Sequence, residues 1–187
     1  MIRIFTVLAT ANAIGLLASF ALGWASKLSG GYQESANAYF LYHFLCGLFT
    51  AICTLLVHCL VITYGLGTGR WVREVSLVYG LPDAPLYKTT RDLKRATTPL
   101  ALAAMLGTIA AAALGGGVQL QGWPWLTHLC GACLAIGLNA WAYVVEMRSL
   151  RTTATILDAV HKEVDRVRAE RGLPSNEESL RMEAESD

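Results

Sequence analysis

The chain has 187 residues, of which 54% are hydrophobic and 16% are charged, and its formal net charge is +1. A soluble domain carries about 25% charged residues, so this composition, with a mean hydropathy of +0.43, favours an integral membrane protein. The basic residues do not gather on one face, which argues against nucleic-acid binding, and the cysteines lie mostly inside apolar runs, unlike those of a secreted disulfide framework.

Four apolar runs, at residues 4–24, 39–66, 99–118 and 124–147, reach the roughly 20 residues that cross a bilayer. The first run is longer than the apolar core of a signal peptide, so we expect a retained anchor and not a cleaved leader. Residues 1–148 are therefore predicted to form an all-α transmembrane domain, a four-helix bundle embedded in the lipid bilayer.

The basic residues predict how the chain is oriented. Lys27 is the only one after the first run, and the connection after the third run has none. Thirteen follow the second and fourth runs: Arg70, Arg73, Lys88, Arg91, Lys94 and Arg95, then Arg148, Arg151, Lys162, Arg166, Arg168, Arg171 and Arg181. Because cytoplasmic loops are rich in Lys and Arg, we expect a multi-pass protein of a bacterial-type inner membrane with both termini cytoplasmic. Trp24, Trp123 and Trp125 then fall at the outer interface.

Small residues stand four positions apart along the first run and again along the third: Ala11, Gly15, Ser19 and Gly23, then Ala103, Gly107, Ala111 and Gly115. Such spacing places them on one helix face and lets neighbouring backbones approach closely. These faces are predicted to serve close packing, with room for something bulky as the alternative.

The second run contains two histidines, His43 near its outer end and His58 near its cytoplasmic end. At about 100° per residue, Gly47, Thr50 and Thr54 fall close to the direction of His43. Polar groups avoid lipid, so this face is predicted to point into the bundle.

The connection after the second run reads "GTGRWVREVSLVYGLPDAP". Trp71, Val75 and Val78 recur at helical spacing, and Gly80 with Pro82 ends the pattern. We expect a short amphipathic helix on the membrane surface. The "GTG" lacks the spacing of a phosphate-binding loop.

The fourth run repeats the arrangement of the second. His128 heads a face of small and polar residues: Ala132, Ala135, Asn139, Ala142 and Glu146. The two runs have the same direction, so His43 and His128 lie at matched depth and both face inward. This ligand placement, over these two positions only, resembles that of membrane b-type cytochromes, and it predicts one haem b with His43 and His128 as the axial ligands of the iron. Gly47 and Gly131 would let the porphyrin edge approach the backbone.

Alternatives stand beside this prediction. A histidine inside the membrane can simply hydrogen-bond to a hydroxyl or a carbonyl of a neighbouring helix. His58 would need a partner of its own for a second haem, as in cytochrome b, and the matching position on the fourth run is Tyr143. One haem is therefore predicted, and His58 is left as an additional candidate residue.

Other polar residues of the fourth run offer further chemistry. Cys130 and Cys133 form a C-x-x-C, which with His43 and Cys46 has the ligand types of a zinc or copper site, but both cysteines point away from His128 on the helix. Redox chemistry with an outside partner stays open for this pair. Asn139 and Glu146 are polar at membrane depth and could line a proton or ion path.

The tail divides into two parts. Residues 149–171 continue the fourth helix with apolar residues three and four apart, either as a coiled-coil seam or as a helix packed on its own loop: Leu150, Thr153, Leu157, Val160, Val164 and Val167. His161 is expected on the surface. Residues 172–187 are acidic and are predicted to be disordered.

Two hypotheses about function follow. The chain contains no catalytic constellation, so we expect a protein that is not an enzyme by itself. The first hypothesis is a haem-binding electron-transfer subunit of a membrane complex, with a quinone as a possible redox partner. The second is a structural or assembly subunit, a homo-oligomer or part of a larger complex, that associates through its cytoplasmic helical tail.

Overall fold

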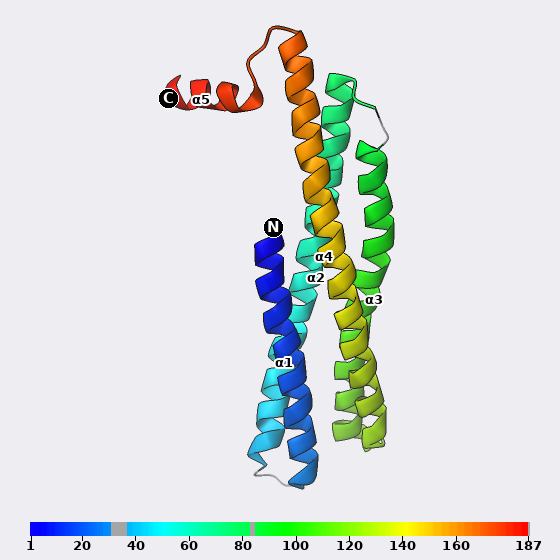
Figure 1. Ribbon diagram of the computed structural model, residues 1–187. Coiled ribbons are helices and arrows are strands. Elements are labelled where there is room, and N and C mark those ends of the chain that lie inside the picture. Colours follow the sequence, from blue (N-terminus) through cyan, green and yellow to red (C-terminus); the bar gives the residue numbers. More distant parts are fainter. Residues whose placement is uncertain (31–36, 83–84, 187) are drawn as a thin grey trace.

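The computed structural model describes residues 1–30, 37–82 and 85–186, and this part of the chain forms five helices and no strands (Figure 1). The helices are α1 (Ile2–Leu28), α2 (Ala38–Tyr79), α3 (Leu86–Gln121), α4 (Trp125–Glu170) and α5 (Asn176–Ser186). The first four are long and apolar enough to cross a membrane, which confirms the prediction of an all-α protein with four potential spanning helices.

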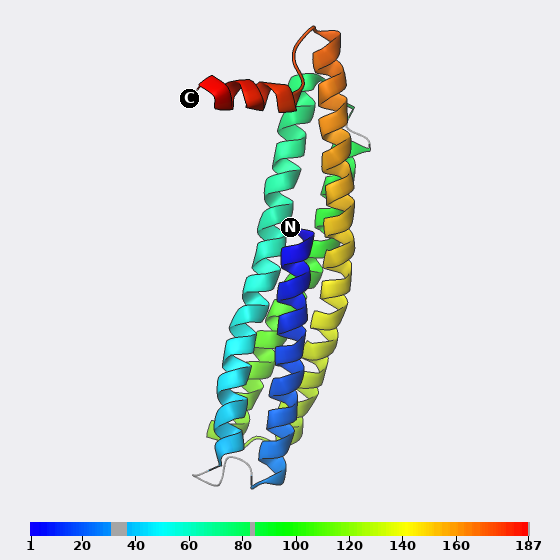
Figure 2. The ribbon, with the colours of Figure 1, turned by 60° about the vertical axis from the view of Figure 1, so that its left-hand side comes forward.

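The four long helices form an antiparallel bundle in which α1 and α3 each pack against both α2 and α4. Consecutive helices alternate in direction, so α2 and α4 run the same way (Figures 1 and 2). We call the end at which α1 meets α2 and α3 meets α4 the turn end, and the opposite end the extension end. The N-terminus lies partway along the bundle, because α2, α3 and α4 continue beyond α1 toward the extension end (Figure 2).

Glycines end two of the long helices. Gly80 after α2 and Gly122 after α3 adopt the left-handed conformation, with φ of 68° and 67°. This conformation strains residues that carry a Cβ atom, so glycine is the usual residue at such a helix end. The helix stop expected at Gly80 is where the structure has it.

The connection after the second apolar run differs from the prediction. It is not a separate surface helix, because α2 continues without interruption through Gly65, Gly67 and Gly69 to Tyr79. Likewise α3 begins at Leu86, well before Pro99, which lies inside the helix. Local breakers are overridden here by tertiary packing, because these segments bury side chains against α4.

That packing forms an apolar cluster beyond the spanning part, which we call the extension cluster: Val72, Leu81, Leu86, Ile156, Val160 and Val164. Leu157 and Val167 pack against it. The apolar residues of the tail helix therefore pack on α2 and α3 of the same chain. This agrees with the second prediction made for them, a helix packed on its own loop. His161 lies against Trp71, with ring centroids 5.2 Å apart.

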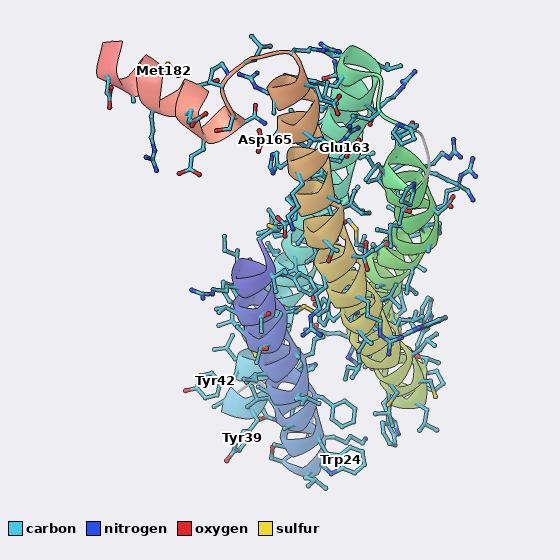
Figure 3. The ribbon with its side chains drawn as sticks, turned by 45° about the horizontal axis from the view of Figure 1, so that its top comes forward. Trp24, Tyr39, Tyr42, Glu163, Asp165 and Met182 are labelled. Atoms are coloured by element: carbon cyan, nitrogen blue, oxygen red, sulfur yellow. The ribbon has the colours of Figure 1, made fainter. Side chains whose placement is uncertain are left out.

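The acidic tail also differs from the prediction, because residues 176–186 form α5, which projects sideways from the end of α4 (Figure 1). Arg168 connects the two helices by donating hydrogen bonds to the carbonyl oxygen of Pro174 and the hydroxyl of Ser179. Glu163 and Asp165 mark this end of α4 and Met182 lies on α5, while Trp24, Tyr39 and Tyr42 mark the turn end (Figure 3).

Replacing Val160 with Asp should unfold the extension. Val160 is fully buried in the extension cluster, and an unpaired charge at a buried position costs about 3 kcal/mol or more. We expect rapid proteolysis of residues 149–170 in detergent. The matched control is Ala159→Asp, whose side chain is exposed and should leave cleavage unchanged. Equal protease resistance of both variants would contradict packing of the seam within the chain.

Candidate functional site

A cavity of about 630 Å³ lies between the four long helices at the turn end. Its volume is in the range of pockets that hold small molecules and cofactors. Each helix lines it, mostly with small or apolar side chains, and Trp24, Trp123, Trp125 and Lys27 stand at its mouth. Trp24 and Trp125 meet edge to face with ring centroids 6.3 Å apart, and the Lys27 ammonium lies 5.2 Å from the Trp125 ring.

His43 of α2 and His128 of α4 both line this cavity. The structure brings their rings together, with centroids 5.9 Å apart and planes inclined by 69°. Two imidazoles on opposite sides of one metal ion, each with a metal–nitrogen bond of about 2 Å, place their ring centroids roughly 6 Å apart. The observed separation of the ring centroids is close to this value.

Each imidazole is anchored to a backbone carbonyl of the preceding helix. His43 Nδ1 lies 2.8 Å from the carbonyl oxygen of Ser19, and His128 Nδ1 lies 2.9 Å from that of Ala111. A carbonyl oxygen can only accept, so in both rings Nδ1 carries the proton and donates it. The neutral ring then has its lone pair on Nε2. Metal-binding histidines are oriented in this way, with the second nitrogen held by a carbonyl or carboxylate.

Glycine makes room for each ring. A Cβ atom on Gly23 would lie 2.8 Å from Cε1 of His43, and one on Gly115 would lie 3.1 Å from Cε1 of His128. In each case the glycine follows the carbonyl partner by four residues, one helical turn. The small-residue faces of α1 and α3 thus pack closely on α2 and α4, as predicted, and at Gly23 and Gly115 the side chain received is a histidine ring.

The α1–α2 and α3–α4 hairpins therefore repeat the same construction. Gly15, Ser19 and Gly23 of α1 correspond to Gly107, Ala111 and Gly115 of α3 at the same spacing, and His43 corresponds to His128. Sequence reasoning noticed both rows of small residues but missed that they form an internal repeat. Aligning the two rows would have revealed the repeat.

The structure separates the two glycines expected near the porphyrin edge. Gly47 lines the cavity, and a Cβ atom there would lie 3.0 Å from the hydroxyl of Ser19. Gly131 instead faces α3, where a Cβ atom would lie 2.6 Å from Leu114, and it is not among the described residues that line the cavity. A group held in the cavity could therefore approach the backbone at Gly47 but not at Gly131, where the sequence also predicted an approach.

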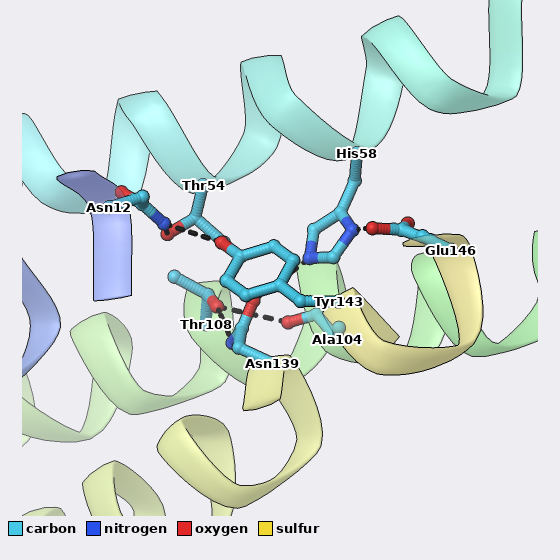
Figure 4. A network of polar contacts seen from close by, with 8 residues as sticks. All are labelled: Asn12, Thr54, His58, Ala104, Thr108, Asn139, Tyr143 and Glu146. Carbon is cyan, nitrogen blue, oxygen red and sulfur yellow. Dashed lines mark hydrogen bonds and ion pairs between the residues drawn. The ribbon is translucent and has the colours of Figure 1, made fainter. Parts of the chain in front are cut away.

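A second group of polar residues, which we call the buried polar cluster, lies deeper in the bundle (Figure 4). His58 is fully buried, with Nδ1 2.7 Å from Oε1 of Glu146 and Nε2 2.9 Å from Oδ1 of Asn139. Its ring stacks on Tyr143 at 5.2 Å. Both nitrogens of His58 are therefore occupied and neither is free to bind a metal.

Hydrogen bonds connect the buried polar cluster with the cavity. Asn139 Nδ2 donates to the hydroxyl of Thr108 at 2.9 Å (Figure 4). It also donates to the carbonyl oxygen of Ala135 at 2.7 Å, and both Thr108 and Ala135 line the cavity. From α1, Asn12 Nδ2 donates to the hydroxyl of Thr54 and to the hydroxyl of Tyr143, whose ring stacks on His58. A continuous polar path thus runs from the cavity floor to His58.

Sequence reasoning singled out His58, Asn139 and Glu146 but did not connect them. The sequence contained the necessary information. Asn139, Tyr143 and Glu146 are spaced by four and three residues and so share one helix face, which lies opposite His58. The sequence analysis sought a partner for His58 only at the position of equal depth, Tyr143. It overlooked Asn139 and Glu146, which lie about one helical turn to either side of Tyr143. Asn12 was missed altogether, although an amide at membrane depth marks a polar site.

The cysteines contribute little to either group. Cys130 and Cys133 are exposed on the outside of α4, and Cys46 lies between α1 and α2, with Sγ 3.9 Å from the carbonyl oxygen of Gly15. Among the described residues, no three His, Cys, Asp or Glu side chains come together as a metal-binding group. A mixed cysteine–histidine metal site therefore lacks ligands here.

Comparisons with protein families, with curated proteins and with solved structures found no match to this chain.

Proposed function

We propose that this protein is a membrane electron-transfer subunit that holds one b-type haem between its two hairpins, with His43 and His128 as the axial ligands. The observation that carries the proposal is the pair of imidazoles 5.9 Å apart whose Nδ1 atoms are both held by carbonyls. Packing alone would require neither that both rings carry their proton on Nδ1 nor that their centroids lie at the distance expected for two ligands of one iron.

The cavity supports the proposal through its volume and its lining. About 630 Å³ of space is lined mostly by small or apolar side chains, which suits the apolar faces of a porphyrin. Lys27 is the only basic residue among the described residues that line the cavity, and it stands at the mouth. Its ammonium is suited to pair with the carboxylate of a haem propionate, because an opposite charge at the rim offsets the cost of placing an anion near the membrane interface.

The roles of the residues follow from this arrangement. His43 and His128 would both hold the haem iron and would leave no open site for a substrate, so the chemistry that a bound haem would supply is one-electron transfer. The carbonyls of Ser19 and Ala111 fix the ring orientation. The apolar lining of the cavity keeps water away and thereby tunes the reduction potential. A quinone is a suitable electron donor or acceptor for such a subunit.

Titration of the purified protein with haemin tests the proposal. We expect a Soret band and a low-spin spectrum at a one-to-one ratio. Gly23→Ala should weaken haem binding about tenfold, since its methyl group displaces the His43 ring and overpacking of this kind costs about 1–3 kcal/mol.

Gly137→Ala is the matched control, because a Cβ atom there meets nothing within 4 Å. It should bind haem as the wild type does. A wild-type protein that gives no Soret band with ample haem would reject the proposal and leave the histidines as packing residues.

A further inference from the structure

The buried polar cluster contains a histidine–carboxylate pair that the axial ligation of a haem does not use. His58 and Glu146 are both fully buried, and Oε2 of Glu146 has no hydrogen-bond partner among the described residues. Ionisable side chains at membrane depth are costly and are found chiefly on proton or ion paths. The pair thus calls for an explanation of its own.

The hydrogen bonds fix how many protons the pair holds. Asn139 donates its amide nitrogen to the Ala135 carbonyl, which can only accept, so its Oδ1 must face His58. His58 Nε2 therefore carries a proton. The contact of 2.7 Å between Nδ1 and Oε1 of Glu146 then contains one more proton, which belongs either to the ring or to the carboxyl. In both forms the pair is neutral overall.

We propose that the His58–Glu146 pair is a proton-binding site linked to the oxidation state of the haem. This inference rests on the proposed haem. When a one-electron donor reduces the iron, the bundle gains one negative charge. In part of the population, a proton taken from water then binds at Glu146, whose Oε2 has no partner among the described residues, and gives an imidazolium beside a neutral carboxyl. Oxidation removes the electron and releases that proton again.

Distance limits the strength of this linkage. His43 and His58 are 15 residues apart on α2, which corresponds to roughly 22 Å along the helix. Two unit charges about 20 Å apart at an effective dielectric constant of about 20 alter each other's equilibria about three- to fourfold. For a one-electron couple, that factor corresponds to a shift of about 30 mV in the reduction potential.

Other ionisable groups near the pair are few. Tyr143 of α4 stacks on His58, and Cys53 of α2 lies close enough to Tyr143 to interact with it electrostatically. The neighbouring apolar cluster is contacted by Tyr64 of α2 and by Met1, which carries an amino group and precedes α1. In the described contacts of the cluster, α3 supplies the neutral hydroxyl of Thr108. Glu146 and His58 are thus the groups placed to take the proton.

The test is the reduction potential of the haem-loaded full chain, measured between about pH 5 and about pH 8. For the wild type we expect the potential to fall by about 30 mV in total as the pH rises, because reduction takes up a proton. Glu146→Gln retains an amide that can donate to His58 Nδ1 but removes the titrating carboxyl, so its potential should fall with pH by clearly less than that of the wild type. Glu163→Gln removes a half-buried carboxylate of the same helix that pairs with Arg166, far from His58, and should behave as the wild type does.

Infrared difference spectra on reduction provide a second readout that does not need the glutamine variant to fold. On reduction of the wild type a carboxylic acid band should appear or change its frequency, and Glu146→Asp should shift that band. A potential that is flat with pH in the wild type, an equal fall in Glu146→Gln, or no carboxyl band would each overturn the inference. All these outcomes require bound haem, so they are distinct from failure of the proposed function, in which no Soret band is seen.

Discussion

Replacing either His43 or His128 with alanine should abolish the low-spin spectrum of the haem-loaded protein. Each histidine has its Nδ1 committed to a carbonyl and offers one Nε2. Removing one ring leaves a single axial ligand, and a five-coordinate haem is high-spin. We expect the double variant to lose the Soret band altogether. Absorption spectra of the purified variants measure both effects.

Two other histidines serve as controls for this prediction. His161→Ala changes a residue of the extension, and His58→Ala changes a ring whose nitrogens are both bonded to Asn139 and Glu146. Both variants should keep a low-spin spectrum, although His58→Ala should lower the thermal stability. If His58→Ala abolished the band and His128→Ala did not, the ligand assignment would be wrong.

A reporter enzyme that is active only outside the cytoplasm should stay inactive when fused at either end of the chain. The basic residues follow α2 and α4, so the extension end is predicted to be cytoplasmic. Fusion after Gly80 should be inactive, whereas fusion after Gly122 should be fully active, because α3 returns the chain to the turn end. The ratio of activities at these two points should be large, since each fusion lies wholly on one side.

Activity at the C-terminal fusion, or silence after Gly122, would overturn either the orientation or the four-span arrangement. The Lys27 position offers a sharper control. It is the only basic residue near the turn end, so Lys27→Gln should leave the pattern of reporter activity unchanged. A reversed pattern in that variant would mean that Lys27, and not the extension end, sets the orientation.

The sequence predicted the spanning helices well because hydropathy reflects a single dominant cost, the transfer of polar groups into lipid. It failed where helices leave the membrane. Gly65, Gly67 and Gly69 favour a break, but α2 passes through them because Val72 is buried against α4. Such packing between distant segments cannot be read from local propensity.

The candidate site was predictable in part for a similar reason. Depth and direction follow from helical geometry, so the meeting of His43 and His128 could be expected from their positions. The anchoring carbonyls could not, because every residue has one and only the packed structure selects Ser19 and Ala111. Glu146 was expected at membrane depth, but its pairing with His58 and its complete burial follow only from the packing of α2 against α4.

The repeated construction of the hairpins has a mechanical consequence. Each histidine is oriented by its own hairpin alone, since Ser19 and Ala111 precede His43 and His128 within the same helix pair. The proposed haem would then act as a cross-link between two independently assembled halves, and tight binding would stabilise their union by mass action. Loss of the cofactor should loosen the turn end, whereas the extension cluster should hold the opposite end together. Amide hydrogen exchange along α3 should then be fastest at the turn end and slow down toward the extension end.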